Sequence, residues 1–188
     1  MTIRKIVLYS ENPKALRKKS RVVERVDKDI KRLIRHLKDT LNAHTDGIGL
    51  AAPQINVHQR VVVVRLRASG DSSSEAGPPL ALVNPKVIEA GDARKDFDGC
   101  LSFPGLYGET FRPHHLRVVG LDENGKPFDR VYQGFDAVVV HHEIDHLDGI
   151  LFIDRIENPE DLYRFKTNVQ GELVRVSAAL DLASQRHD

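Results

Sequence analysis

The pattern His142-Glu143-Ile144-Asp145-His146 constrains this chain more than any other feature of its sequence. On a helix, residues four apart lie on one face, so both imidazoles can bind a single metal ion. Glu143 then lies beside the metal without binding it, where a base can take a proton from a metal-bound water. Two solvated histidines are the alternative, but apolar residues surround the motif. They predict a buried helix, whose imidazoles need partners such as a metal.

A third metal ligand is needed, because two histidines do not make a tight site. Many zinc proteases use a downstream residue, for which Glu157 and Glu160 are the candidates here. A lone cysteine is most often a small core residue. However, Cys100 follows a glycine and precedes Pro104-Gly105, which indicates an ordered loop. Cys100 is the better candidate, since a thiolate with two imidazoles leaves one tetrahedral position open for catalysis.

Length and composition predict one globular domain, residues 1–188, that works in the cytoplasm. The net charge of +1 gives no electrostatic case for binding DNA or a membrane surface. The start of the chain lacks the apolar stretch of a secretory signal, and no run approaches the ~18 apolar residues of a membrane span. The one cysteine cannot form an intramolecular disulfide, which suits a reducing compartment.

Hydrophobic periodicity predicts a mixture of helices and strands. We expect helices over 28–43, capped by Asp27, over 135–147, ended by Gly149, and over 161–182. A polar loop is expected over 68–79. Strands are expected over 61–66, 80–83, 86–89 with a bend at 84–85, 116–121 and 127–132, the last two forming a hairpin with Asn124-Gly125 in its turn.

Three separate motifs together resemble those of peptide deformylases, which remove the formyl group from the N-terminal formylmethionine of new proteins. They are Gly47–Gln54 (GIGLAAPQ), Gly99–Ser102 (GCLS) and His142–His146 (HEIDH). Similarity extends roughly from Ile6 to Ile156. The resemblance implies an α+β fold in which antiparallel strands surround a central helix with the H-E-x-x-H motif, together with an N-terminal and a C-terminal helix.

The resemblance also implies a role for each matching residue. One divalent metal ion would be bound, Fe(II) in the cell, with zinc, nickel or cobalt as substitutes. Glu143 would take a proton from the metal-bound water and return it to the leaving amine. The side chain of Gln54 and the N–H of Leu101 would stabilise the oxyanion. The metal ligands would be Cys100, His142 and His146.

The substrate implied by the resemblance is a formylated nascent polypeptide, met at the ribosome near the tunnel exit. Its methionine side chain needs an apolar pocket. Its backbone can pair with an extended strand edge around Ile48 and Gly49. The pocket candidates share a helix face or lie beside it, and they are Ile48, Phe135, Val138 and Val139.

Two residues depart from the family pattern. Asp98 stands where glutamate is usual, so its expected pair with Arg112 must be reorganised or water-mediated. His141 stands where glutamine is usual. Asp98 is also the only sequence support for a second alternative, a deformylase that has lost activity and only binds nascent chains or ribosomes. Candidates for contact with ribosomal RNA lie on the expected C-terminal helix: Arg164, Lys166 and Arg175.

Overall fold

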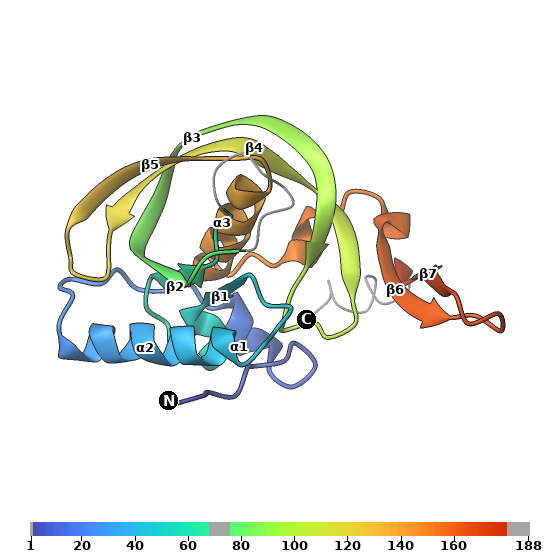
Figure 1. Cartoon of the computed structure of the whole chain (residues 1–188), viewed down its shortest axis with the longest axis horizontal. Helices are drawn as coiled ribbons and strands as arrows, with labels where there is room; N and C mark the ends of the chain where they lie inside the picture. The colour runs from blue at the N-terminus through green and yellow to red at the C-terminus, as the bar shows by residue number, and fades with distance from the viewer. Residues whose placement is uncertain (1, 68–75, 180–188) are drawn as a thin grey trace.

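The computed structural model describes residues 2–67 and 76–179, which form a mixed α+β structure around one curled antiparallel sheet (Figure 1). Strands pair in the order β1-β2-β3-β4-β6-β7, and β5 also pairs with β4. The strands are β1 (Gly49–Ala51), β2 (Val61–Val64), β3 (Leu80–Gly99), β4 (Tyr107–Leu121), β5 (Pro127–Gln133), β6 (Leu162–Thr167) and β7 (Leu173–Ser177). The α-helices are α1 (Pro13–Arg17), α2 (Lys28–Asn42) and α3 (Gly134–Leu147), and short 3-10 helices are η1 (Ala52–Ile55), η2 (Phe152–Arg155) and η3 (Pro159–Asp161).

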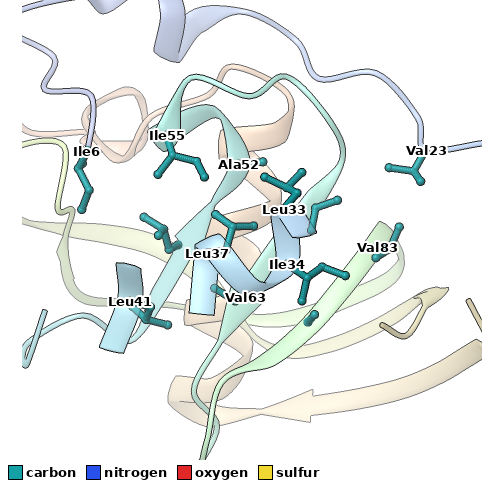
Figure 2. Packing of buried hydrophobic residues seen from close by; sticks show 13 residues of the cluster. Ile6, Val23, Leu33, Ile34, Leu37, Leu41, Ala52, Ile55, Val63 and Val83 are labelled. Atoms are coloured by element: carbon teal, nitrogen blue, oxygen red, sulfur yellow. The ribbon is translucent and has the colours of Figure 1, made fainter. Parts of the chain in front are cut away.

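Helix α2 covers one face of the sheet. The helix predicted over 28–43 is confirmed, and its end differs by one residue. The carboxylate of Asp27 accepts hydrogen bonds from the N–H groups of Asp29 at 2.9 Å and Ile30 at 3.0 Å, which satisfies the first turn. The apolar stripe of α2 is buried, and each buried leucine contributes about 1.5–3 kcal/mol. Figure 2 shows this stripe, Leu33, Ile34, Leu37 and Leu41, in one cluster with Val63 and Val83 of the sheet.

Strand β2 is a run of four valines because both of its faces are covered. Successive strand residues point to opposite faces. Val61 and Val63 pack in the cluster that includes α2, whereas Val62 and Val64 pack in the cluster that includes α3. The buried strand expected over 61–66 is thus confirmed, although it ends two residues earlier. Helix α3 lies inside the curl, on the side opposite α2 (Figure 1).

Strands β3 and β4 form a long curled ribbon over α3 (Figure 1). The two strands expected over 80–83 and 86–89 are one strand that continues to Gly99. The expected bend is present as a register shift at Asn84, which has a φ of 51°. The Asn84 side chain accepts a hydrogen bond from the N–H of Val23 and donates one to its carbonyl, both at 2.8 Å. These two bonds hold the bend in place.

The hairpin expected over 116–121 and 127–132 is confirmed, within longer strands β4 and β5. Gly125 in its turn has a φ of 81°, which explains why glycine follows asparagine there. The loop expected over 68–79 falls mostly on residues 68–75, which lie outside the described part.

The prediction of a C-terminal helix over 161–182 is wrong for the residues of this range that the structure describes. Strands β6 and β7 form an antiparallel hairpin there, which Figure 1 shows in orange and red at the end of the sheet, where β6 pairs with β4. Residues 180–182 lie outside the described part. The N-terminal helix of the expected fold is α2, so one of the two terminal helices is confirmed and the other is not.

The turn between β6 and β7 explains this error. The Asn168 side chain accepts hydrogen bonds from the N–H groups of Gln170 at 3.0 Å and Glu172 at 2.9 Å, and Gly171 has a φ of 83°. Val169 lies at a position that would face the core in the expected helix, but it is 97% exposed at this turn. The spacing of three and four was therefore coincidental, and the aromatic and β-branched residues form strands.

Candidate active site and metal centre

Helix α3 carries the two histidines of the motif into the interior of the curl. The run Val138–Val140 favours a strand locally, but all three side chains are buried, and packing overrides that preference. The predicted stop at Gly149 is consistent with its φ of 74°. A side chain there would also meet the carbonyl oxygen of Arg17 at 2.2 Å, so glycine is required. The chain after the helix end that bears His146 therefore packs closely against the backbone of Arg17.

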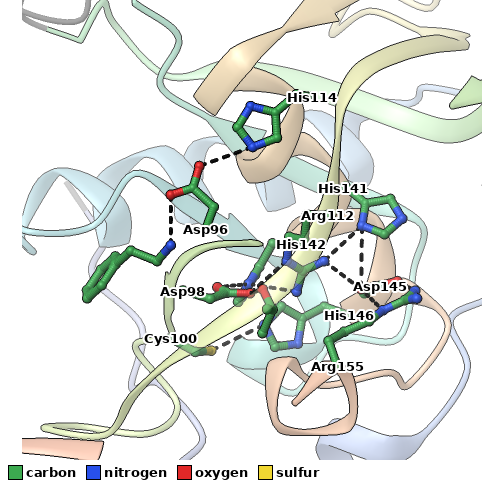
Figure 3. Close-up of polar contacts among 12 residues, drawn as sticks. Asp96, Asp98, Cys100, Arg112, His114, His141, His142, Asp145, His146 and Arg155 are labelled. Atoms are coloured by element: carbon green, nitrogen blue, oxygen red, sulfur yellow. Dashed lines mark hydrogen bonds and ion pairs between the residues drawn. The ribbon is translucent and has the colours of Figure 1, made fainter. Parts of the chain in front are cut away.

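Cys100, His142 and His146 come together at this end of α3 (Figure 3). Their ligand atoms lie within 4.8 Å of one another, and Cys100 Sγ is 3.3 Å from His146 Nε2. A thiolate and two imidazoles at this spacing fit one ion of zinc, iron, cobalt or nickel. No second group of three such ligands occurs in the part of the chain that the structure describes. The alternative ligands Glu157 and Glu160 are exposed and do not belong to this group.

Asp98 fixes the orientation of His142. Its Oδ1 accepts a hydrogen bond from His142 Nδ1 at 2.8 Å, which leaves Nε2 for a metal. Its Oδ2 accepts hydrogen bonds from Thr110 Oγ1 at 2.9 Å and Arg112 Nε at 2.6 Å. Burial disfavours the charged carboxylate, but the charges and hydrogen bonds of His142 and Arg112 outweigh it. They hold the pKa of Asp98 well below its usual range, so it stays an acceptor.

Arg112 contacts Asp98 directly, so the pair, which was expected to be reorganised or water-mediated, needs no bridging water. The guanidinium is fully buried, and its Nη1 also reaches Asp145 Oδ2 and His141 Nδ1, both at 2.8 Å (Figure 3). Arginine can only donate, so His141 accepts through Nδ1. Burial lowers the pKa of His141 to about 4, which keeps it neutral for this contact. The long Arg112 side chain, held by three partners, reaches the carboxylate of Asp98 without a bridging water, although aspartate is shorter than glutamate.

Glu143 is buried beside the ligand group. Burial raises its pKa to about 7, and its Oε2 has no hydrogen-bond partner among the described residues. Gly49 of β1 lies against this carboxylate. A Cβ atom at Gly49 would be 2.3 Å from Glu143 Oε1, closer than any two such atoms can approach. The absence of a side chain at Gly49 therefore creates the space that the Glu143 carboxylate occupies.

Replacing Gly49 with alanine is expected to lower kcat by about 10- to 100-fold, because the Glu143 carboxylate must move by about an ångström. The flexible side chain can move aside, so Tm should change by less than about 4 °C. Steady-state kinetics and thermal unfolding measure the two effects. Gly91→Ala is the matched control, since a Cβ atom there meets nothing within 4 Å. Equal kcat values for Gly49→Ala and Gly91→Ala would contradict this account.

The two predicted oxyanion donors lie next to Cys100. Gln54 is buried, and its Oε1 accepts a hydrogen bond from the N–H of Ala51 at 2.8 Å. This bond turns Nε2 toward Cys100 Sγ, at 3.4 Å, and Ser102 Oγ, at 3.2 Å. Leu101 follows Cys100 in the same loop and lines the adjacent cavity. Both groups are therefore positioned beside the ligand group.

A cavity of about 710 Å³ opens beside these residues. The structure brings together around it every predicted site residue except His146, which completes the ligand group. The lining residues that the sequence analysis missed include Phe97 and Tyr107, because it did not extend β3 and β4 to this end. The predicted residues that line it are Ile48, Gly49, Gln54, Cys100, Leu101, Phe135, Val138, Val139, His142 and Glu143.

A curled sheet surrounds a helix with the H-E-x-x-H motif. A cysteine from the adjoining loop and a buried glutamate lie at an apolar cavity. Together these features define a single-metal hydrolase. Comparison with known proteins gives the family. Residues 3–161 match the polypeptide deformylase family model. A peptide deformylase from Thermomicrobium roseum is 41% identical over 162 residues, 86% of this chain and 90% of the relative. A peptide deformylase from Aquifex aeolicus is 41% identical over 157 residues, which cover 82% of this chain and 88% of the relative.

Solved structures agree with the sequence comparison. The crystal structure of peptide deformylase from Ehrlichia chaffeensis has a TM-score of 0.74 and 33% identity, and the match covers 84% of this chain and 89% of that one. The chain therefore belongs to the polypeptide deformylase family, whose members are metal-dependent hydrolases that remove N-formyl groups from newly made peptides.

Proposed function

We propose that this enzyme removes the formyl group from the formylmethionine at the N-terminus of newly made proteins and releases formate, with Glu143 moving the protons. The observation that carries the proposal is the convergence of Cys100, His142 and His146 within 4.8 Å, next to a cavity that Glu143 lines. A metal ligand set, a buried acid/base and an apolar cavity in one place are what hydrolysis of an N-terminal amide requires.

We assign one divalent metal ion to Cys100, His142 and His146, with Fe(II) in the cell and zinc, nickel or cobalt as substitutes. When bound, the ion would act as a Lewis acid and lower the pKa of a coordinated water. The contact between Asp98 and His142 supports this assignment, because metal-binding histidines commonly donate their second N–H to a carboxylate.

Glu143 takes a proton from the water that attacks the formyl carbon and returns it to the leaving nitrogen. The C–N bond breaks, and formate and a free α-amine result. The position of Glu143 between the two histidines on α3 supports this role, as does the Oε2 atom without a partner in the described chain. Proton transfer of this kind contributes about 10²–10⁴-fold to the rate.

Gln54 and the N–H of Leu101 stabilise the negative charge that develops on the formyl oxygen. The hydrogen bond from Ala51 holds the Gln54 amide in place before substrate binds, so no reorganisation is needed during the reaction. One preorganised donor of this kind lowers the barrier by roughly 3–4 kcal/mol.

The substrate methionine binds among Ile48, Phe135, Val138 and Val139, which line the cavity with apolar surface. The substrate backbone pairs with β1 at residues 48–49. Strand β1 ends the sheet and pairs only with β2 in the described chain, so no strand covers its second edge. Main-chain pairing gives affinity without selecting later side chains.

Formate release from formyl-Met-Ala-Ser tests the proposal, with acetyl-Met-Ala-Ser as the matched substrate control. We expect formate from the first peptide, no cleavage of the second and no internal cleavage of casein.

Asp98→Glu should change the rate by about tenfold or less, or about 1.4 kcal/mol in the barrier, because Arg112 reaches either acid. Metal-loaded enzyme that releases formate only after Asp98→Glu would establish the binding-only alternative. Cleavage of casein would favour a protease.

We place the enzyme in the cytoplasm, near the ribosomal tunnel exit, as a single domain over 1–188. The substrate class supports the location, and one sheet running from β1 to β7 supports the single domain. No helix among the described residues is long and apolar enough to cross a membrane. The cations considered for contact with ribosomal RNA lie on the β6–β7 hairpin and not on a helix: Arg164, Lys166 and Arg175.

A further inference from the structure

We propose that the outward side of helix α2 binds the phosphate backbone of an RNA double helix. Four residues, called the basic face below, make the contacts: Lys28, Lys31, Arg32 and Arg35. None of them lines the catalytic cavity, so this binding site is separate from the active site. Only the choice of RNA over DNA rests on the proposed function, because newly made proteins are synthesised on RNA.

Positive charge is concentrated at the start of the chain. Residues 1–38 contain 13 of the 28 lysines and arginines but only 4 of the 27 aspartates and glutamates. The remaining residues are therefore net acidic, and the net charge of +1 conceals two regions of opposite sign. Such an asymmetry within one chain is typical of a surface that binds a polyanion. The net charge alone, which gives no electrostatic case for such a partner, does not describe this region.

The basic face lies on the side of α2 that points away from the core. Its four side chains are exposed, whereas Leu33 and Leu37 on the opposite side of the helix are buried against the sheet. Positions 28, 31, 32 and 35 are spaced by three or four residues, so they form one row about 10 Å long. Figure 1 shows α2 on the side of the sheet opposite α3. The row is therefore accessible to a large partner.

The charges of the basic face do not stabilise the helix that carries them. Lys28 and Lys31 lie at the N-terminal end of α2, where the helix dipole disfavours cations, and the last turn has no basic residue. Lys28 with Arg32 and Lys31 with Arg35 are like-charged pairs at a spacing of four, which repel. Among the described residues, only Arg32 of this face has a carboxylate partner, Asp29 at 2.9 Å. The face therefore lacks counter-charge, which a phosphate backbone would supply.

The positive region extends beyond the row to the N-terminal segment of the chain. The N–H of Arg4 donates a hydrogen bond to Thr40 Oγ1 at 2.9 Å, which fixes this segment beside α2. Burial lowers the pKa of His36, and the charges of Arg4, Arg32 and Arg35 lower it further. These three cations therefore act on the same side of the helix.

A phosphate backbone fits the basic face better than a membrane surface does. A helix that lies in a membrane surface needs an exposed apolar side next to its cations. The apolar side of α2 is not available, because Ile34 and Leu41 pack in the cluster beneath the helix. A nucleic-acid duplex requires only a row of cations that matches successive phosphates, which lysine and arginine bind directly. Binding of this kind is independent of sequence and weakens steeply with salt.

Fluorescence anisotropy with a short labelled RNA duplex tests the proposal. We expect a Kd of about 10⁻⁶–10⁻⁴ M, and log K should fall with log salt at a slope of about −4, as four phosphate contacts require. The triple variant Lys28→Gln, Lys31→Gln and Arg35→Gln should weaken binding by at least about tenfold and bring the slope to about −1. The double variant Lys28→Arg and Lys31→Arg keeps the charges and should bind as the unchanged protein does.

The matched control removes three cations outside the basic face, as Lys86→Gln, Lys126→Gln and Lys166→Gln. The net charge changes equally, but the affinity and the salt slope should stay as in the unchanged protein. Lys166 lies on β6, so this control also tests the cations of the β6–β7 hairpin. Both triple variants should keep Tm within about 4 °C. They should also keep formate release from formyl-Met-Ala-Ser, because the altered residues do not line the cavity.

Equal weakening by the two triple variants would show that net charge alone governs binding, and it would overturn the proposal. A Kd for RNA above about 10⁻³ M would do the same. So would tighter binding to a DNA duplex of the same sequence, or binding only to vesicles of phosphatidylserine and phosphatidylcholine. Failure of the proposed function is distinguishable, because it appears as absent formate release, whereas RNA binding is measured without any reaction.

Discussion

Replacing Glu143 with glutamine is expected to lower kcat by about 10²–10⁴-fold while the protein keeps its metal. Glutamine has the same shape but cannot take a proton from the attacking water. The three ligands are separate side chains, and the contact of Asp98 with His142 does not involve Glu143. Formate release gives the rate, and elemental analysis of the same sample gives the metal content.

Glu157→Gln is the matched control for Glu143→Gln, because Glu157 is an exposed glutamate eleven residues after His146, beyond the C-terminal end of α3. Its activity should equal that of the unchanged enzyme. A loss of less than tenfold in Glu143→Gln would show that another group moves the proton. Loss of the metal would show that Glu143 has a structural or ligand role.

Replacing Cys100 with alanine is expected to abolish tight metal binding and, with it, formate release. Only two imidazoles would remain, and two ligands do not hold a divalent ion tightly. Cys100 lies in a loop and is partly exposed, so the fold should persist, which circular dichroism would check. Competition with a chromophoric chelator measures the loss of metal affinity.

Glu160→Ala is the control for Cys100→Ala, since Glu160 is a downstream candidate ligand that the structure leaves exposed. It should bind metal as the unchanged enzyme does. If Cys100→Ala retained one tightly bound metal per chain and Glu160→Ala lost it, the upstream cysteine would not be the third ligand. The protease alternative would then gain support.

Local periodicity was enough to predict α2 and α3, because each has an apolar face or a buried stretch and a clear start or stop residue. Asp27 caps α2, and Gly149 follows α3. The same periodicity failed for β6 and β7, where apolar residues happen to recur at helical spacing. The turn at Asn168 and Gly171, together with pairing to β4, determines the structure there.

The grouping of Cys100, His142 and His146 as a candidate metal site was also predictable, because two of the three lie on one helical turn and the third is the only cysteine of the chain. The direct contact of Arg112 with Asp98 and His141 was not. It depends on the register of β3 against β4, which no short stretch of sequence specifies. The ring contacts of Phe97 and Phe165 with Tyr107 were missed for the same reason, since these residues meet only through strand pairing.

The most direct test of the central claim is a metal titration of metal-free enzyme under anaerobic conditions, with formate release from formyl-Met-Ala-Ser as the readout. The site at Cys100, His142 and His146 predicts that activity with Fe(II) rises in proportion to bound metal and stops rising at one ion per chain. Full activity without metal would contradict the account. So would a plateau reached only at two ions per chain, or Fe(II) bound at one ion per chain with no formate released.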